Sequence, residues 1–393
     1  MRLRILLVLL CLCFGGAIWS FSPNHLPVQR IAQWLAGSNS TQMPNLATPK
    51  VSENTEPAPT TTELSVLPSL YEHQEYGGSI PRVLLNIPKH QAASIILTEK
   101  IKSVAGVASS STTTRTTAVQ DALVNIFCTL KTKSSIRATS GSGVFITSTG
   151  VILTNAHVAQ FLLVPSNTAH VTSSCVVRSG SPAVPKYYAD VLYISPLWIT
   201  DNASLLRTEH PSGTGERDYA LLYVTKAVDG TLPSSFPALS LDVTPLQKNS
   251  KNQVVRAGGF PAEIIRTEGT KALLMPTVAT TTITELFTYT RDNIDLIGIA
   301  PSAVGEQGSS GGPITTLDNT VIGLISTKGN EAKDGVKSLR AITIPYIDRT
   351  IRDEVHVGLL DTILSKLPER ARIFRATVEP LLRDMVLDNI DQQ

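Results

Sequence analysis

The clearest pattern along the chain is a succession of short apolar runs between about residues 118 and 350. The runs are rich in Val, Ile, Leu and Thr, and Gly, Ser, Pro and Asn separate them. Many short strands with frequent turns favour an antiparallel sandwich or barrel, and the strand–helix alternation of a parallel α/β protein is missing. The expected strands are Leu123–Leu130, Gly143–Thr147, Val151–Thr154, Val171–Val177, Tyr187–Ile194, Ala220–Val224, Val254–Gly258, Val321–Ser326 and Ala341–Ile344.

Beyond this region the apolar positions take a helical spacing. Residues four apart form an apolar stripe, which predicts one helix made by Ile347, Ile351, Val355, Leu359 and Ile363. Pro368 is expected to stop this helix. A second helix is expected near Thr377 as its N-cap, with Pro380 in its first turn. Residues 351–393 are therefore predicted to be a helical extension, and Ala92–Val104 is expected to be a further helix.

The N-terminus has the pattern of a targeting segment. Arg2 and Arg4 precede an uncharged apolar stretch over residues 5–21. This predicts that residues 1–22 are a signal anchor or, alternatively, a cleaved signal peptide. The following residues 23–117 contain stretches rich in Ser, Thr and Pro, which predict an extracytoplasmic stalk and linker. We therefore expect a protein that is either held at the outer face of a membrane or secreted.

Charge and cysteine usage exclude several classes of function. The net charge is only +2, which argues against a nucleic-acid binder. No Cys-x-x-Cys pair is present, so a zinc or redox motif has no support, and no metal or organic cofactor is expected. Cys128 and Cys175 could form a disulfide in an exported domain or could remain two buried thiols.

Three motifs in the strand-rich region carry candidate chemistry. In the first, His157 stands just past a strand end; in the second, Asp218 opens an apolar strand; in the third, Ser310 stands among glycines. A serine hydroxyl becomes a nucleophile when a histidine accepts its proton and a buried carboxylate orients that histidine. The motifs are Gly141–Ile146 with Gly150–Val158, then Asp218–Leu222, then Gly308–Pro313.

These motifs resemble those of the chymotrypsin/trypsin-like serine peptidases, and most closely those of the bacterial Deg/HtrA-type branch. The resemblance covers about residues 118–350 and implies a trypsin-like domain of two antiparallel six-stranded β-barrels. It implies that His157 is the general base, that Asp218 orients it and that Ser310 is the nucleophile. It also implies an oxyanion hole made by the backbone N–H groups of Gly308 and Ser310.

The resemblance extends to substrate binding. Val304 is expected at the floor of the primary specificity pocket, and because it is apolar we expect small or medium apolar side chains before the scissile bond. Glu306 or Lys328 could also reach the cleft. Ser326 takes the place of a serine that supports the acidic member of the triad. The residues expected to contact substrate are Val304, Gln307, Ser326, Thr327 and Ala341.

The sequence also departs from the wider family. Ser309 stands where zymogen-activated relatives carry an aspartate, so activation by a new amino terminus is not expected. Too few residues follow position 350 for a PDZ domain. The segment Pro182–Arg217 is expected to contain an extended surface loop, either a tolerated insertion or a cover over the cleft.

The function predicted from these observations is a serine endopeptidase that cleaves unfolded or extended proteins outside the cytoplasm. Its partners would be protein or peptide substrates and, through the N-terminal segment, a membrane. The alternatives are a catalytically silent binding or sensing protein with the same fold, and an esterase or other acyl transferase. The natural substrate and the oligomeric state do not follow from the sequence.

Overall fold

The computed structural model describes residues 87–104, 117–133, 135–165, 171–207, 215–262, 273–289, 292–305, 307–331, 337–364 and 366–390. The predictions for the N-terminal segment 1–22 lie outside these residues, as do those for most of the stalk and linker. Among the described helices, none is both long and apolar enough to cross a membrane.

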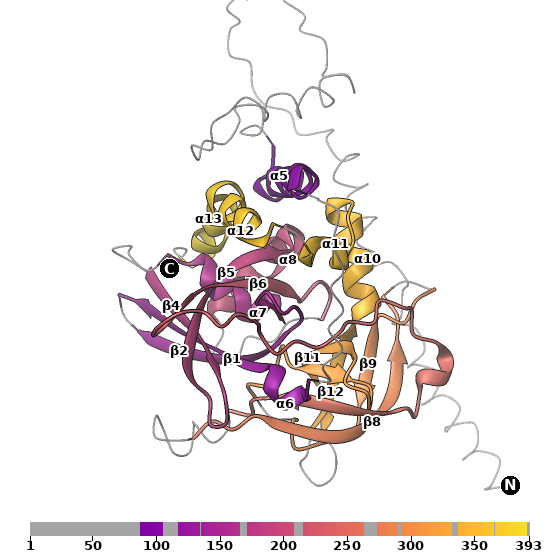
Figure 1. Ribbon diagram of the computed structural model, residues 1–393. Helices are drawn as coiled ribbons and strands as arrows, with labels where there is room; N and C mark the ends of the chain where they lie inside the picture. The colour runs from indigo at the N-terminus through magenta and orange to yellow at the C-terminus, as the bar shows by residue number, and fades with distance from the viewer. Residues whose placement is uncertain are drawn as a thin grey trace, which may run out of the picture. The chain divides into compact units, whose positions relative to one another are not determined.

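The first six strands close into a barrel, called barrel 1 (Figure 1). The strand order is β1-β2-β3-β6-β5-β4, with antiparallel pairing throughout. β3 and most of β6 are buried along their length, so side chains on both faces of these two strands are covered. The strands are β1 (Leu123–Thr132), β2 (Ile136–Phe145), β3 (Val151–Thr154), β4 (Val171–Ser179), β5 (Val184–Ile194) and β6 (Ala220–Ala227).

The second six strands close into barrel 2. The strand order is β10-β11-β12-β9-β8-β7, again antiparallel. The expected fold class, all-β with two six-stranded barrels and C-terminal helices, is confirmed. The strands are β7 (Val254–Gly259), β8 (Thr277–Phe287), β9 (Leu296–Ile299), β10 (Pro313–Thr315), β11 (Val321–Glu331) and β12 (Lys337–Thr343).

The apolar runs located the strands that are rich in Val, Ile and Leu and missed three others. β8 is long but rich in threonine, and most of its side chains are only half-buried. β9 has four residues and β10 has three. Short or threonine-rich strands give little hydrophobic pattern, so only their barrel partners identify them.

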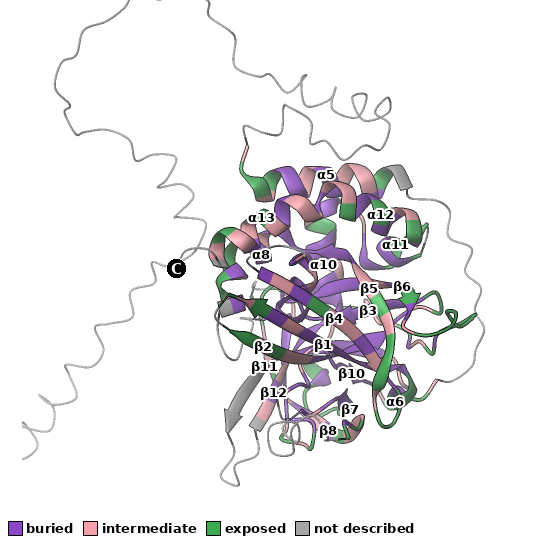
Figure 2. Ribbon diagram, turned by 90° about the vertical axis from the view of Figure 1, so that its left-hand side faces the viewer, coloured by how far each residue is buried: buried purple, intermediate pink, exposed green. Residues whose placement is uncertain are grey.

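A layer of helices covers one side of barrel 1 (Figures 1 and 2). Helix α12 packs on β5, and α5 packs on α8, α10, α12 and α13. The long helices are α5 (Lys89–Val104), α10 (Ile344–Val355), α12 (Leu367–Thr377) and α13 (Glu379–Ile390). The short ones are α6 (Val119–Ala122), α7 (Ala156–Ala159), η2 (Gln160–Leu163), α8 (Pro196–Asn202), η3 (Ala203–Arg207), η4 (Lys248–Ser250) and α11 (Leu359–Ile363).

The prediction of one long C-terminal helix was wrong. The apolar stripe is divided between α10 and α11, because His356 takes a left-handed conformation at φ 60° and ends α10. Pro368 lies in the first turn of α12 and therefore does not stop a helix. Thr377 is the last residue of α12, and its hydroxyl donates to the Ile373 carbonyl, so it is not the N-cap of the next helix. Pro380 does lie in the first turn of α13.

The segment Pro182–Arg217 was expected to contain an extended surface loop; residues 208–214 lie outside the described part of the chain, so this stays a prediction. This segment contains β5, α8 and η3, and the side chains of Trp198, Ile199 and Leu206 are buried. Ser195 caps α8 by accepting a hydrogen bond from the Trp198 N–H. The described part of the segment therefore belongs to the core beneath the helical layer.

The helical layer and barrel 1 share one hydrophobic core. Buried side chains of α10, α12 and α13, among them Ile347, Phe374 and Leu382, belong to the same cluster as Ile152 and Leu221 of barrel 1. Barrel 2 has a smaller cluster of its own, although some of its side chains belong to the larger cluster, namely Leu296, Val321, Leu324 and Ile342. The C-terminal helices are thus an integral part of the domain that contains β1 to β6.

Candidate active site

His157 and Asp218 are brought together by the pairing of two strands. β3 and β6 are antiparallel and place Thr154 opposite Ala220, so the residues that follow β3 lie against those that precede β6. His157 is the second residue of α7, which begins directly after β3. Its Nδ1 lies 2.8 Å from Asp218 Oδ2, and its backbone N–H donates to Asp218 Oδ1 at 2.9 Å.

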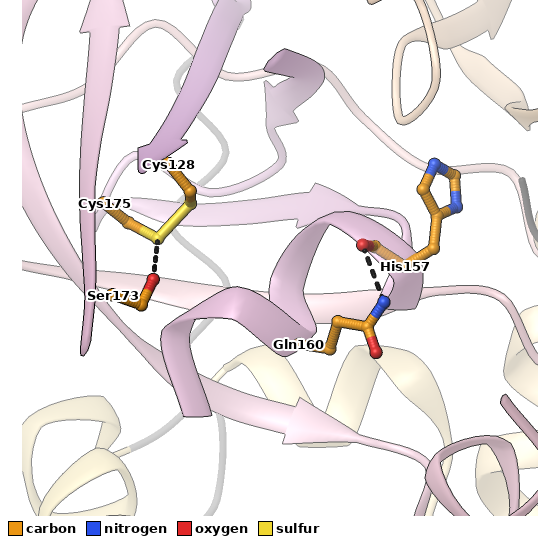
Figure 3. Close-up of a disulfide and its surroundings, with 5 residues drawn as sticks. All are labelled: Cys128, His157, Gln160, Ser173 and Cys175. Carbon is orange, nitrogen blue, oxygen red and sulfur yellow. Dashed lines mark hydrogen bonds between the residues drawn. A yellow bond between two sulfur atoms is a disulfide. The ribbon is translucent and has the colours of Figure 1, made fainter. Parts of the chain in front are cut away.

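The surroundings of Asp218 fix its carboxylate from several sides. The side chain is fully buried, and Ser326 Oγ donates to Oδ2 at 2.8 Å. Asn155 Nδ2 donates to the Asp218 carbonyl at 2.7 Å. When Asp218 is ionised it accepts from Nδ1–H of His157, which leaves the lone pair of the neutral ring on Nε2. Gln160 Nε2 donates to the His157 carbonyl at 3.2 Å, which adds to the anchoring of α7 (Figure 3).

The loop that carries Ser310 is pressed against barrel 1. The Ser310 carbonyl accepts a hydrogen bond from the Ser142 N–H at 2.7 Å, and the Gly311 N–H donates to the Ile325 carbonyl at 2.8 Å. Gly311 has φ +87°, and a Cβ at this position would stand 2.1 Å from the Ser142 carbonyl oxygen. Only glycine fits this approach, and the loop is thereby held against β2 of barrel 1.

Two backbone N–H groups of this loop are available to a ligand. The Gln307 carbonyl accepts from the Ala262 N–H at 2.7 Å, and the Ser309 carbonyl accepts from the Gly312 N–H at 2.9 Å. In a trans peptide the N–H points opposite to the carbonyl, so the N–H groups of Gly308 and Ser310 point away from these anchors. Within the described part of the chain, neither N–H meets a protein acceptor. Such paired donors suit a developing oxyanion.

Ser310 and Ser309 differ sharply in their surroundings. Ser310 is half-buried, whereas Ser309 is fully buried and its hydroxyl has no hydrogen-bond partner among the described residues. Of the two serines in this loop, Ser310 is therefore the one that solvent or a substrate can reach.

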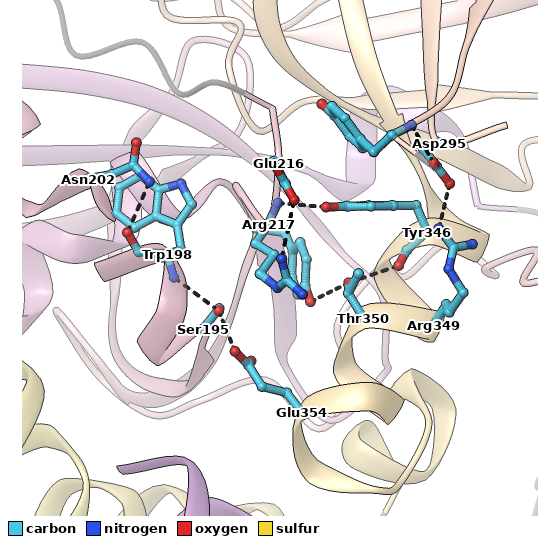
Figure 4. A network of polar contacts seen from close by, with 12 residues as sticks. Ser195, Trp198, Asn202, Glu216, Arg217, Asp295, Tyr346, Arg349, Thr350 and Glu354 are labelled. Atoms are coloured by element: carbon cyan, nitrogen blue, oxygen red, sulfur yellow. Dashed lines mark hydrogen bonds and ion pairs between the residues drawn. The ribbon is translucent and has the colours of Figure 1, made fainter. Parts of the chain in front are cut away.

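Helix α10 contacts both residues that flank Asp218 (Figure 4). The Arg217 N–H donates to the Tyr346 hydroxyl at 3.1 Å, with Arg217 in a left-handed conformation at φ 52°. On the other side, the Tyr219 hydroxyl and Thr350 Oγ1 are 2.7 Å apart. Helix α10 therefore contributes to the position of the Asp218 backbone.

Glu354, one turn beyond Thr350 on α10, is a half-buried residue whose carboxyl group contacts barrel 1. It accepts hydrogen bonds from Ser195 Oγ at 2.8 Å and from the Tyr193 hydroxyl. Burial raises the pKa of Glu354, although the Tyr193 and Ser195 hydrogen bonds and the charge of Arg217 act in the opposite direction. Burial, together with the negative charge of Glu354, also raises the pKa of the Tyr193 hydroxyl.

The residues expected to contact substrate lie in different surroundings in the structure. Ser326 lies against Asp218, and Gln307 is half-buried in the loop. Val304 and Ala341 are fully buried in the core of barrel 2, so neither presents a surface in this structure. The side chains of Glu306, Thr327 and Lys328 lie outside the described residues. The specificity expected before the scissile bond stays a prediction.

A disulfide joins β1 to β4 in barrel 1 (Figure 3). Cys128 and Cys175 stand directly opposite each other in the strand register, and their sulfur atoms are 2.05 Å apart. The described residues contain no group of His, Cys, Asp and Glu that could hold a metal ion.

Several supporting residues were not singled out from the sequence. Ser142 lies inside the first quoted motif, where its polarity between two glycines was an available signal. Asn155 also lies within that motif. Tyr346 and Glu354 carried no recognisable signal, because only the packing of α10 brings them to barrel 1.

Part of the chain is similar to known proteins. Residues 141–324 match the sequence profile described as the trypsin-like peptidase domain. The solved structure of the active form of the Rv3671c protease from M. tuberculosis is 17% identical, with 64% of this chain and 96% of that chain covered at a TM-score of 0.36. The inactive serine-to-alanine variant of that protease is 19% identical, with the same coverage and a TM-score of 0.33. No curated protein matches the chain.

Proposed function

We propose that this chain is a serine-type peptidase with His157, Asp218 and Ser310 as its catalytic triad, because residues 141–324 match the trypsin-like peptidase domain. The observation that carries this assignment is the buried His157–Asp218 contact, 2.8 Å long, in a barrel to which Ser142 ties the glycine loop with its half-buried serine. The reaction is the hydrolysis of internal peptide bonds in protein substrates.

The chemistry proceeds through an acyl-enzyme. Ser310 Oγ attacks the carbonyl carbon of the scissile bond while His157 Nε2 takes the hydroxyl proton. The carbonyl oxygen gains a negative charge and accepts hydrogen bonds from the N–H groups of Gly308 and Ser310. The C–N bond then breaks as His157 passes its proton to the leaving amine. Water, deprotonated by His157, attacks the ester and releases the second product together with free Ser310.

The substrate is an unfolded or extended polypeptide. β11 pairs with β10 only as far as Leu324, opposite Pro313, whereas its pairing with β12 continues to Glu331. Within the described residues, the stretch of β11 after Ile325 therefore has no neighbouring strand on the β10 side. An extended peptide satisfies such an edge by adding a strand, and a folded protein does not. This edge begins at Ser326, next to Asp218.

The test compares the full-length chain with Ser310→Ala, using Ser309→Ala as a matched control in the same loop. With reduced, carboxymethylated casein as substrate, we expect hydrolysis by the wild type and Ser309→Ala, and a loss of at least about 10³-fold for Ser310→Ala. A fluorophosphonate probe should label the wild type and not Ser310→Ala. Equal activity of all three proteins would contradict the assignment, and an unlabelled, inactive wild type would favour a binding protein.

We also propose that the peptidase domain works outside the cytoplasm, anchored by residues 1–22 or secreted. The disulfide between Cys128 and Cys175 supports this location, because such bonds persist in oxidising compartments. A membrane-impermeant amine reagent applied to intact protoplasts, together with the medium around them, tests it. We expect labelled protein in the membrane fraction or in the medium; protein protected until lysis contradicts the location.

A further inference from the structure

Ser142 uses every polar group it has. It is a fully buried residue of β2, in barrel 1. Its N–H donates to the Ser310 carbonyl at 2.7 Å, and its own carbonyl accepts from Thr154 Oγ1 at 2.7 Å. The main chain of Ser142 thus joins the nucleophile loop to the strand that leads to His157. Any residue type can form these two main-chain contacts.

The hydroxyl of Ser142 makes contacts that only this side chain supplies. Oγ accepts the Phe260 N–H at 2.8 Å and lies 2.7 Å from the Gly308 carbonyl oxygen, to which it donates. Because Phe260 N–H can only donate and a carbonyl can only accept, the single hydroxyl proton of Ser142 must point to Gly308. The hydrogen bonds therefore run in one direction, from the Phe260 N–H to Ser142 Oγ and from Ser142 Oγ to the Gly308 carbonyl in the loop that carries Ser310.

Gly308 has particular need of such an anchor. It lies at φ +97°, and having no side chain it can adopt several backbone conformations at little cost. The preceding peptide is held by the Ala262 N–H on the Gln307 carbonyl, and the following peptide is held by the Ser142 hydroxyl. These two bonds together determine which way the N–H of Gly308 points. Without the hydroxyl, the Gly308 carbonyl would be a buried acceptor lacking its donor.

We propose that Ser142 is a positioning residue whose hydroxyl holds Gly308 in the conformation that presents its N–H to the oxyanion. This inference rests on the proposed function, since it assigns Ser142 a part in that reaction. Ser142 itself does not touch the reacting atoms. Its effect is expected in the transition state, where the oxyanion forms, more than in the binding of the uncharged substrate.

The experiment uses full-length wild type, Ser142→Ala and Ser309→Ala. Ser309→Ala is the matched control because it also removes a buried serine hydroxyl, from the loop that carries Gly308 and Ser310. That hydroxyl has no hydrogen-bond partner among the described residues. On a peptide amide substrate we expect kcat of Ser142→Ala to fall at least about tenfold, with KM within about threefold, since losing an oxyanion donor outright typically costs about 10²–10³-fold. Ser309→Ala should keep the wild-type kcat.

A second readout separates positioning from general damage to the fold. A peptidyl trifluoromethyl ketone forms an oxyanion with the enzyme, whereas the matching peptidyl alcohol does not. We expect Ser142→Ala to bind the ketone more weakly, in proportion to the loss of kcat/KM. Its affinity for the alcohol should equal that of the wild type. Equal weakening of both inhibitors, or a kcat within twofold of wild type, would overturn the proposal.

Ser142→Cys covers the case in which the alanine variant does not fold. A thiol has nearly the size of the hydroxyl but is a weak donor, so kcat should lie below that of wild type and ketone binding should weaken with it. A Cys variant with wild-type kcat overturns the role of Ser142. A wild type that neither cleaves the substrate nor reacts with a fluorophosphonate contradicts the proposed function itself, so the two failures are distinct.

Discussion

The two barrels have the same strand order but are supported differently. Barrel 1 shares its core with the helices α5, α10, α12 and α13, and a disulfide joins two of its strands. Barrel 2 has a smaller cluster of its own, and four of its residues join the larger one. The His157–Asp218 geometry follows mainly from strand pairing inside barrel 1, with one added hydrogen bond from Ser326 of barrel 2, whereas Ser310 is positioned by contacts between the barrels. The proposed catalytic base thus depends mostly on the fold of one barrel, and the proposed nucleophile on the docking of two.

The first prediction tests the His157–Asp218 geometry, which the pairing of β3 and β6 in barrel 1 sets. Asp218→Asn should lower kcat by about 10⁴-fold, as the equivalent change does in trypsin-type triads, because an amide favours the wrong tautomer of the histidine. Since Asp218 is buried, steady-state kinetics should be paired with circular dichroism to show that the variant is folded. Asp201→Asn, at an exposed aspartate of α8, serves as the control and should be fully active. A folded Asp218→Asn with more than a tenth of wild-type kcat would remove Asp218 from the triad.

The second prediction disrupts the docking between the barrels. Gly311→Ala places a Cβ about 2.1 Å from the Ser142 carbonyl oxygen, in a backbone conformation that disfavours side chains. We expect a loss of about 3–5 kcal/mol in the free energy of unfolding, measured with urea, from the clash and the strain together. Residual activity in the folded fraction should be low.

Gly230→Ala is the matched control for this change. Gly230 also has a positive φ, +72°, but nothing lies within 4 Å of a Cβ built there. Its cost should be only that of the backbone strain, about 1–2 kcal/mol. Equal losses for both variants would show that the approach to Ser142 does not matter.

The third prediction removes the covalent support of barrel 1. Replacing Cys128 and Cys175 together by serine should lower the free energy of unfolding by about 2–4 kcal/mol, because the bond closes a long loop in the unfolded chain. The separation of the two residues is 47 positions. Activity at moderate temperature should change little, since neither residue contacts His157 or Asp218. A large loss of kcat with an unchanged free energy of unfolding would contradict this prediction, because it would mean that the disulfide positions the active site and does not stabilise barrel 1.

The smallest effect is expected from Glu354→Gln, which tests the helical layer. Burial gives Glu354 a pKa above its ordinary value, so the folded state keeps the proton to higher pH than the unfolded state does. The free energy of unfolding contributed by this group therefore falls as the pH rises from the unfolded value through the raised one. Glutamine does not titrate, so the Glu354→Gln variant lacks this decrease in the free energy of unfolding with rising pH.

Urea unfolding at pH 4 and at neutral pH checks this sign. Relative to Glu354→Gln, the wild type should lose stability on going to neutral pH, by up to about tenfold in the unfolding equilibrium constant for each unit by which the pKa is raised. The groups that face Glu354, namely Tyr193, Ser195 and Arg217, are present in both proteins. Parallel pH profiles would show that Glu354 has the same pKa in the folded and unfolded states.

The sequence identified the parts of the site that local patterns encode. His157, Asp218 and Ser310 each stand in a short motif whose strand, turn or glycine context was visible along the chain. The apolar runs indicated an antiparallel sandwich or barrel, and the two six-stranded barrels followed from the resemblance of the three motifs to those of serine peptidases. The threonine-rich β8 and the short β9 and β10 carried too little hydrophobic contrast to be recognised.

What could not be predicted depends on contacts between distant segments. Tyr219 meets Thr350 at a separation of 131 residues, and Ser195 meets Glu354 at 159. Neither end of such a contact looks unusual in sequence. The break between α10 and α11 depends on the left-handed His356, a conformation that an apolar periodicity does not report.

The shared core of barrel 1 and the C-terminal helices has a consequence for synthesis. The ribosome makes β1 to β6 first, but Leu382 and Val386, which help to enclose that core, follow all six strands of barrel 2. The nascent chain therefore cannot bury the full apolar surface of barrel 1 until barrel 2 and α13 have been made. His157 and Asp218 thus acquire their final surroundings only after Ser310 has been made, so a half-made chain has no assembled active site with which to attack its neighbours.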